Sequence, residues 1–159
     1  MTDDSEPDNA GPLDGPHVRC DDDLLELLAG DWKITRTMGK EIAHSRMCAE
    51  WELNHQFLQL HMIDENEPPE YEAIVSIGYE YEISRYVIYW LDTFGGRYSL
   101  NGYGARAGNS ILFVFESRDG LLHNRFSYDA KSNSWHSRID QRAHDGPWKL
   151  FLEDDFVRV

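Results

Sequence analysis

The sequence is poor in cysteine, in basic side chains and in long apolar runs, and each shortage narrows the classes of protein to consider. Only two of the 159 residues are cysteines, Cys20 and Cys48, so one disulfide bridge could form, although a reduced, cytoplasmic protein is favoured. No apolar run approaches the roughly 20 residues that cross a bilayer as a helix. The 15 Lys and Arg residues stand against 29 Asp and Glu, and the formal net charge is −14. Because such a chain repels phosphate backbones and anionic lipid heads, we expect neither nucleic acid nor a membrane as a partner.

Motifs of known catalytic and metal chemistry are also missing. The sequence contains no nucleophile elbow, phosphate loop or triad spacing. Its seven histidines are scattered, without a His-x-His or Cys-x-x-Cys pair, whereas zinc or iron needs three or four convergent ligands. We therefore expect no metal and no cofactor, and we assign no catalytic residue.

The N-terminal part of the chain divides into a predicted tail and a predicted helical turn. Residues 1–15 are acidic, rich in proline and glycine, and without the basic and apolar regions of a signal peptide. We predict that residues 1–20 form a disordered acidic tail and that residues 21–159 form one domain. Three aspartates, residues 21–23, then precede a leucine-rich turn that ends near Gly30. Carboxylates are favoured at a helix N-terminus, so this turn is predicted to be a short helical plug.

Turn signals recur at regular spacing through the rest of the chain, which has no convincing helical period of apolar residues. The nine breaks fall at residues 39–40, 54–55, 64–70, 80–84, 95–96, 104–109, 119–120, 129–133 and 145–147. About ten short strands in succession, without helices between them, favour a meander that closes on itself and so removes its edges. The predicted fold is all-β: a closed antiparallel up-and-down barrel of about ten strands.

Alternation of side chains along these strands predicts which face points inward. The predicted inward positions are Met47, Ala49, Trp51, Leu53, Tyr71, Ala73, Val75, Ile77, Tyr79, Leu122, Asn124, Phe126, Tyr128, Trp135, Ser137 and Ile139. The opposite faces carry charged side chains, among them Arg125, Arg138 and Asp140, which we interpret as a charged ladder on the outer surface. A water-filled interior would reverse this assignment.

The two ends of the predicted barrel hold a Gly-x-Trp and a late arginine. Gly30-Asp31-Trp32 opens the first strand, and Arg158 lies on the last. In a closed barrel these strands are neighbours, so we predict that the Arg158 guanidinium lies over the Trp32 indole as a structural closure.

These residues, with others in order along the chain, are similar to a known group. The Gly-x-Trp opening, Gly78-Tyr79-Glu80, the Tyr-x-x-x-Trp-x-Asp pattern of residues 86–92, and Trp148 with the final Phe and Arg resemble a bacterial family of uncharacterised lipocalin-like (calycin-type) barrels. That family is related in fold to fatty-acid-binding proteins and nitrobindins, which implies a calycin-like barrel. This chain lacks the helix pair between the first two strands and the C-terminal haem-ligating His of those relatives. We therefore expect neither a helical lid nor haem.

A barrel interior lined by aromatic residues suggests a binding site for a hydrophobic or amphipathic small molecule. The predicted ligand-contacting residues are Arg36, Trp51, His61, Trp90, Tyr98, Phe113, Phe126 and Trp135. Arg36 shares the face of Trp32, so we interpret it either as an anchor for a ligand carboxylate or as the partner of an internal acid. If its face of the strand points inward, His61 could hydrogen-bond a ligand; it lies outward if Leu58, Leu60 and Met62 take the interior.

Three functions stay open on the sequence. The preferred one is non-catalytic binding of a small hydrophobic molecule in the barrel. The second is a barrel enzyme of isomerase or cyclase type that uses an internal His/Arg pair. The third is a filled barrel that acts as an interaction module. The oligomeric state is left open.

Overall fold

The computed structural model describes residues 19–159, so the predicted tail lies outside the described residues except for Arg19 and Cys20. Cys20 is already buried, and its backbone N–H donates to the His55 carbonyl at 2.9 Å. The elements are α1 (Asp23–Glu26), β1 (Gly30–Met38), β2 (Glu41–Glu52), β3 (Phe57–Asp64), β4 (Glu72–Glu80), β5 (Arg85–Asp92), the 3-10 helix η1 (Gly96–Tyr98), β6 (Leu100–Ala107), β7 (Ser110–Ser117), β8 (Gly120–Asp129), β9 (Ser134–Ala143) and β10 (Lys149–Arg158).

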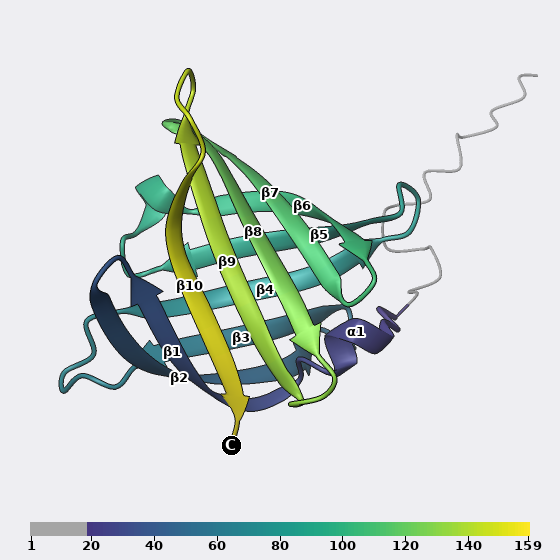
Figure 1. Cartoon of the computed structure of the whole chain (residues 1–159). Helices are drawn as coiled ribbons and strands as arrows, with labels where there is room; N and C mark the ends of the chain where they lie inside the picture. Colours follow the sequence, from purple (N-terminus) through teal and green to yellow (C-terminus); the bar gives the residue numbers. More distant parts are fainter. Residues whose placement is uncertain (1–18) are drawn as a thin grey trace, which may run out of the picture.

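The ten strands form a closed antiparallel barrel (Figure 1), as the turn spacing predicts. Each strand pairs with the next one along the chain, and β1 also pairs with β10, so the sheet has no free edge. Connections alternate between the two ends of such a meander. The β1–β2, β3–β4, β5–β6, β7–β8 and β9–β10 connections surround what we call the open end, and α1 lies at the other, the closed end.

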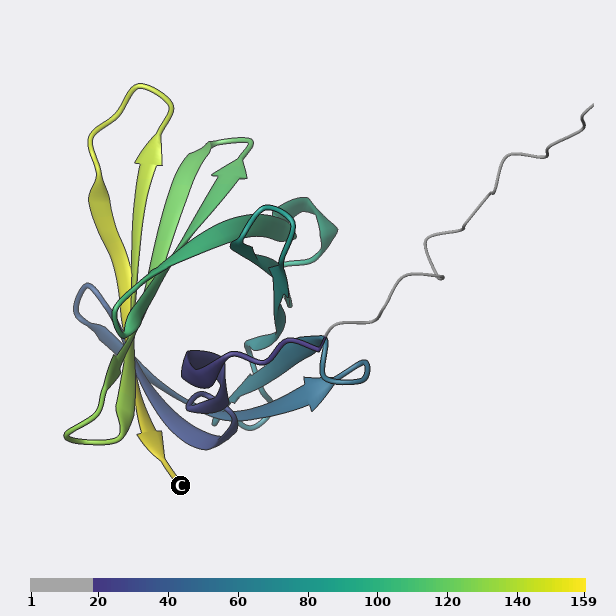
Figure 2. The ribbon, with the colours of Figure 1, turned by 90° about the vertical axis from the view of Figure 1, so that its right-hand side faces the viewer.

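The helix α1 lies at the closed end, and Figure 2 shows it within the lower part of the ring. Asp22 caps it by accepting hydrogen bonds from the backbone N–H groups of Leu24 and Leu25 at 3.0 and 2.8 Å. Both leucines are buried in the core. The predicted plug is therefore present, although its helical part spans only four residues.

The predicted closure of the barrel is confirmed. Trp32 and Arg158 are paired in the β1–β10 register, and the guanidinium carbon lies 4.1 Å from the centroid of the Trp32 ring. Gly30 has a φ of 121°, and a Cβ there would lie only 2.5 Å from Arg158 Nη1. The glycine of the Gly-x-Trp motif therefore leaves the space that the arginine occupies.

Glycine inside β6 allows a large ring to lie against the strand. A Cβ at Gly104 would lie 2.6 Å from Phe113 Cδ1 on the neighbouring strand β7. Because this glycine makes room inside a strand rather than in a turn, β6 runs on to Ala107, further than the predicted break at residues 104–109.

The alternation of faces is largely confirmed. Among the predicted inward residues, those buried in the core are Met47, Ala49, Ala73, Val75, Ile77, Phe126 and Trp135, and Asn124 and Ser137 are buried polar residues. Leu53 is an exception, and its prediction is wrong. It lies in the turn after β2 with a φ of 50°, and its side chain is 71% exposed.

Candidate functional site

A cavity of about 1350 Å³ occupies the open end of the barrel. Its rim contains the exposed apolar side chains of Met38, Phe94, Tyr98 and Phe151. Deeper in, the wall is formed by Trp90, Leu100, Phe115, Leu122, Ile139 and Leu152, which come from six different strands. The site is therefore a deep apolar space that opens to solvent through an apolar rim.

Charged side chains of both signs interrupt this apolar lining. The basic ones are Arg36, Arg97, Arg118, Arg142 and Lys149, and the acidic ones are Asp64, Glu70, Asp92, Glu116 and Asp119. The equal numbers give the lining no net charge of its own.

The floor of the cavity begins with a buried ion pair between neighbouring strands. Arg36 of β1 donates from Nε and Nη2 to the two carboxylate oxygens of Asp154 on β10, both at 2.8 Å. Asp154 is 2% exposed. Burial alone would lower the pKa of Arg36, but the hydrogen bonds and the negative charge of Asp154 raise that pKa above its usual value. The Arg36 guanidinium therefore stays charged at neutral pH and is bound on two sides by the Asp154 carboxylate.

The floor continues across the next two strands. Ser137 of β9 is the register partner of Asp154, and its hydroxyl donates to Asn124 Oδ1 on β8 at 2.7 Å. Both side chains are 1% exposed. Asn124 Nδ2 is buried without a hydrogen-bond partner in the described part of the chain. We call Arg36, Asp154, Ser137 and Asn124 the polar row.

Below the polar row, on the side of α1, the barrel is filled by aromatic rings. Tyr86, Phe113, Phe126 and Phe156 form a continuous series across the interior, with successive ring centroids 6.3, 5.9 and 6.1 Å apart. All four are at most 3% exposed. These rings fill the interior of the barrel between the polar row and α1, and a smaller hollow of about 430 Å³ lies beside Tyr86 at the closed end.

The indoles beside this core hold the plug in place. Trp32 Nε1 donates to the Leu28 carbonyl at 2.8 Å, and Trp135 Nε1 donates to the Leu27 carbonyl at 3.2 Å. Arg158 donates to the carbonyls of Leu27 and Ala29 at 2.9 and 3.0 Å. The segment after α1 is thus tied to three side chains of the barrel.

The structure brings together three of the predicted ligand residues. Arg36, Trp90 and Tyr98 all line the cavity at the open end. Arg36 lies at its floor, Trp90 in its wall and Tyr98 at its rim, so the three contact different depths of the same space.

The other predicted ligand residues do not line this cavity. Phe113, Phe126 and Trp135 belong to the filled core. Trp51 is partly buried beside that core and stacks on His55 with ring centroids 4.0 Å apart. His61 lies on the outer face of β3, with its Nε2 2.7 Å from Glu72 Oε1, so it forms no internal pair with Arg36.

Sequence reasoning missed the role of Asp154, Ser137 and Asn124. The alternation of faces did place Asn124 and Ser137 inward, so a polar residue at an inward position was the available signal. The partners of these side chains come from other strands, so alternation along one strand does not identify them. Asp154 lies in a strand that mixes polar and apolar residues, so its sequence does not indicate that this side chain points inward.

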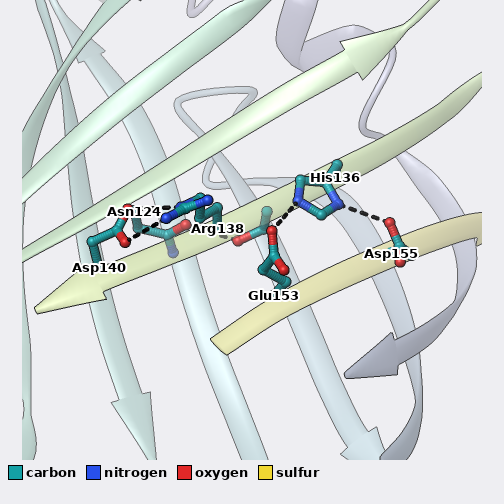
Figure 3. Close-up of polar contacts among 7 residues, drawn as sticks. Asn124, His136, Arg138, Asp140, Glu153 and Asp155 are labelled. Carbon is teal, nitrogen blue, oxygen red and sulfur yellow. Dashed lines mark hydrogen bonds and ion pairs between the residues drawn. The ribbon is translucent and has the colours of Figure 1, made fainter. Parts of the chain in front are cut away.

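The predicted charged ladder lies on the outer face, as Figure 3 shows for β9 and β10. Arg138 donates from Nε and Nη2 to Asp140 at 2.9 and 3.0 Å. The His136 ring nitrogens lie 2.7 Å from Asp155 and 3.3 Å from Glu153. Strand β9 therefore presents exposed ion pairs outward and the buried Ser137 inward.

Residues 19–159 contain neither a group of metal-ligating side chains nor a membrane-spanning helix. In that range no three His, Cys, Asp or Glu side chains are grouped as a metal site would require. None of the helices in the same range has the length and apolar character needed to cross a bilayer.

Comparisons with known proteins concern the fold. No family model matches the sequence, and no curated protein matches it either. A solved structure with a similar fold is the crystal structure of Rv2717c from M. tuberculosis, with a TM-score of 0.61 and 13% sequence identity. The match covers 85% of this chain and 94% of that chain. At this identity the likeness supports the closed barrel and leaves the calycin family assignment a prediction.

Proposed function

We propose that this protein binds a small hydrophobic or amphipathic molecule in the open end of its barrel, without catalysing a reaction. The observation that supports this most directly is the cavity of about 1350 Å³, which is walled by apolar side chains and entered through an apolar rim. Ligand sites are typically concave and mostly apolar, with a few polar groups that fix orientation. Arg36 and Asn124 of the polar row supply such groups in the cavity lining.

The geometry favours this function over the alternatives. A filled barrel acting as an interaction module would need side chains that fill its open end, but the cavity occupies that end. A barrel enzyme with an internal His/Arg pair would need His61 inside, whereas His61 is on the outer face with Glu72. No arrangement of described residues favours a particular reaction.

The test is titration with Nile red, a neutral apolar dye whose emission increases in an apolar site. We expect saturable binding with a dissociation constant in the micromolar range, as burial of a drug-sized apolar surface can provide. Leu122→Trp adds an indole to the cavity wall and should weaken binding at least about tenfold.

Ile74→Trp is the matched control, because it adds the same indole to the outer face of β4, where Ile74 is exposed. It should leave the dissociation constant unchanged. If neither Nile red nor a medium-chain fatty acid binds the wild-type protein, or if both tryptophan variants weaken binding equally, the proposed function is wrong.

A further inference from the structure

One polar atom at the cavity floor, Asn124 Nδ2, has no hydrogen-bond partner in the described part of the chain. Asn124 lines the cavity from the inward face of β8 and is 1% exposed. Its Oδ1 accepts a hydrogen bond from Ser137 Oγ at 2.7 Å, but its Nδ2 is buried without a partner among residues 19–159. Buried polar atoms in folded proteins are nearly always paired, so an unpaired donor beside a cavity requires an explanation.

We propose that Asn124 Nδ2 binds the ligand's hydrogen-bond acceptor and that this acceptor is neutral, as in the carbonyl of a ketone, ester or amide. This inference rests on the proposed function and names the class of ligand that the cavity takes. An amide nitrogen only donates, so its partner must be an acceptor. The terminal torsion of asparagine is soft, so a small rotation turns Nδ2 toward the cavity at little cost.

The charges around Asn124 disfavour a carboxylate ligand. The one cation at the floor, Arg36, already gives two hydrogen bonds to Asp154, which cancels its charge. Equal numbers of acidic and basic side chains line the cavity, and the chain as a whole carries a formal charge of −14. An anionic ligand beside Asn124 would lose its hydration next to a cation that is already paired, because the other basic residues of the lining come from the turns and strand ends of the open end. A carbonyl loses far less.

The cavity-lining side chains next to Asn124 are apolar, so the part of the ligand next to its carbonyl must also be apolar. Its register partner on β9 is Ile139, and the next cavity residue along β8 is Leu122, which is opposite Phe115. A hydrogen bond in such an apolar setting is stronger than one exposed to water. The ligand is therefore an apolar molecule that carries a neutral acceptor at its inner end.

The experiment compares three naphthalenes that carry their substituent at the same ring position. Acetylnaphthalene presents a carbonyl, isopropenylnaphthalene replaces C=O by C=CH₂ in the same shape, and naphthoate presents a carboxylate. Their affinities are measured by displacement of Nile red. For the wild-type protein we expect the ketone to bind about tenfold more tightly than the alkene, and more tightly than naphthoate.

Asn124→Leu keeps the volume and removes the donor, so it should abolish the preference for the ketone over the alkene. Asn101→Leu is the matched control, since Asn101 lies on the exposed face of β6; the preference should persist there. In the wild-type protein, the side-chain amide resonance of Asn124 should move downfield with the ketone and not with the alkene. This NMR measurement stands even if Asn124→Leu does not fold.

The two proposals fail in different ways. Absence of Nile red binding to the wild-type protein contradicts the proposed function itself. Binding of Nile red with equal affinities for ketone and alkene, or with tighter binding of naphthoate, leaves a binding site but overturns the role assigned to Asn124. An unchanged ketone preference in Asn124→Leu overturns it as well.

Discussion

The two halves of the barrel are built from the same ten strands, yet one is filled and the other is hollow. In the closed half, the rings of Phe113, Phe126 and Phe156 pack across the interior below the plug. In the open half, the inward positions carry residues such as Leu122 and Ile139, which leave about 1350 Å³ unfilled. Strand number alone therefore does not decide whether a barrel is hollow, because side chains at different depths of one barrel fill it to different extents.

The boundary between the halves is the polar row. Arg36 and Asp154 are neighbours in the β1–β10 register, and Asp154 and Ser137 are neighbours in the β9–β10 register. A ligand that enters from the open end meets polar groups where the aromatic core begins. The core that stabilises the fold and the candidate binding site therefore lie at different depths of one barrel. The following predictions test that division.

The largest effect is expected from truncating an indole in the closed half. Trp32 is fully buried, so Trp32→Ala should reduce the free energy of unfolding by about 3–5 kcal/mol. Trp90→Ala in the cavity wall should cost less than half as much, because that side chain already borders unfilled space. Urea denaturation of both variants measures the difference. Equal losses would mean that the open half supports the fold as much as the closed half does.

The next effect concerns the boundary itself. Arg36→Met should reduce the free energy of unfolding by about 3 kcal/mol, because it leaves the buried Asp154 carboxylate without its partner. The double variant Arg36→Met, Asp154→Leu should recover most of that loss, since both charges are then gone. Chemical denaturation of the two single variants and the double variant forms the required cycle. Additive losses would show that the two residues are not coupled.

A smaller effect is expected at the closure of the barrel. Arg158→Leu removes the guanidinium from the Trp32 face together with its two hydrogen bonds to backbone carbonyls. We expect a loss of about 1–2 kcal/mol in the free energy of unfolding, since the arginine is exposed to solvent. Thermal and urea denaturation measure it. Nile red affinity should stay unchanged, because this contact is far from the cavity; a weaker affinity would show that closure controls the open half.

The smallest effect is expected on the outer face. Arg138 and Asp140 form the same bidentate contact as Arg36 and Asp154, at 2.9 and 3.0 Å, but their side chains are 48% and 28% exposed. Solvent screens such pairs, and many contribute nothing measurable. Arg138→Ala should therefore leave the unfolding midpoint unchanged within error. A loss as large as that of Arg36→Met would contradict the claim that burial separates the two pairs.

Local patterns in the sequence were sufficient for the architecture. Turn signals such as Gly39-Lys40 and Asp119-Gly120 separate the strands, and alternation places Val75 and Ile77 inward. The pairing of Trp32 with Arg158 follows once the barrel is closed, because the first and last strands then become neighbours. The strand positions and their inward faces depend on residues close together in the chain. The pairing of Trp32 with Arg158 depends only on which strands are first and last.

The candidate site depends on contacts that local patterns do not contain. Arg36 shares the inward face of Trp32, and the sequence left open whether a ligand or an internal acid pairs with it; the acid is Asp154, 118 residues further along the chain. His61 and Met62 compete for the interior, and the packing of β3 places Met62 inside.

The sequence by itself determined that the chain forms about ten strands, which faces of them turn inward, and how its ends meet. Only the tertiary structure decided that the rings gather in one half, that Asn124 pairs with Ser137 through one atom alone, and that a cavity lies above them. The physical reason is that alternation assigns a side chain to a face but not to a depth. Depth is set by strand tilt and register around the whole closed sheet.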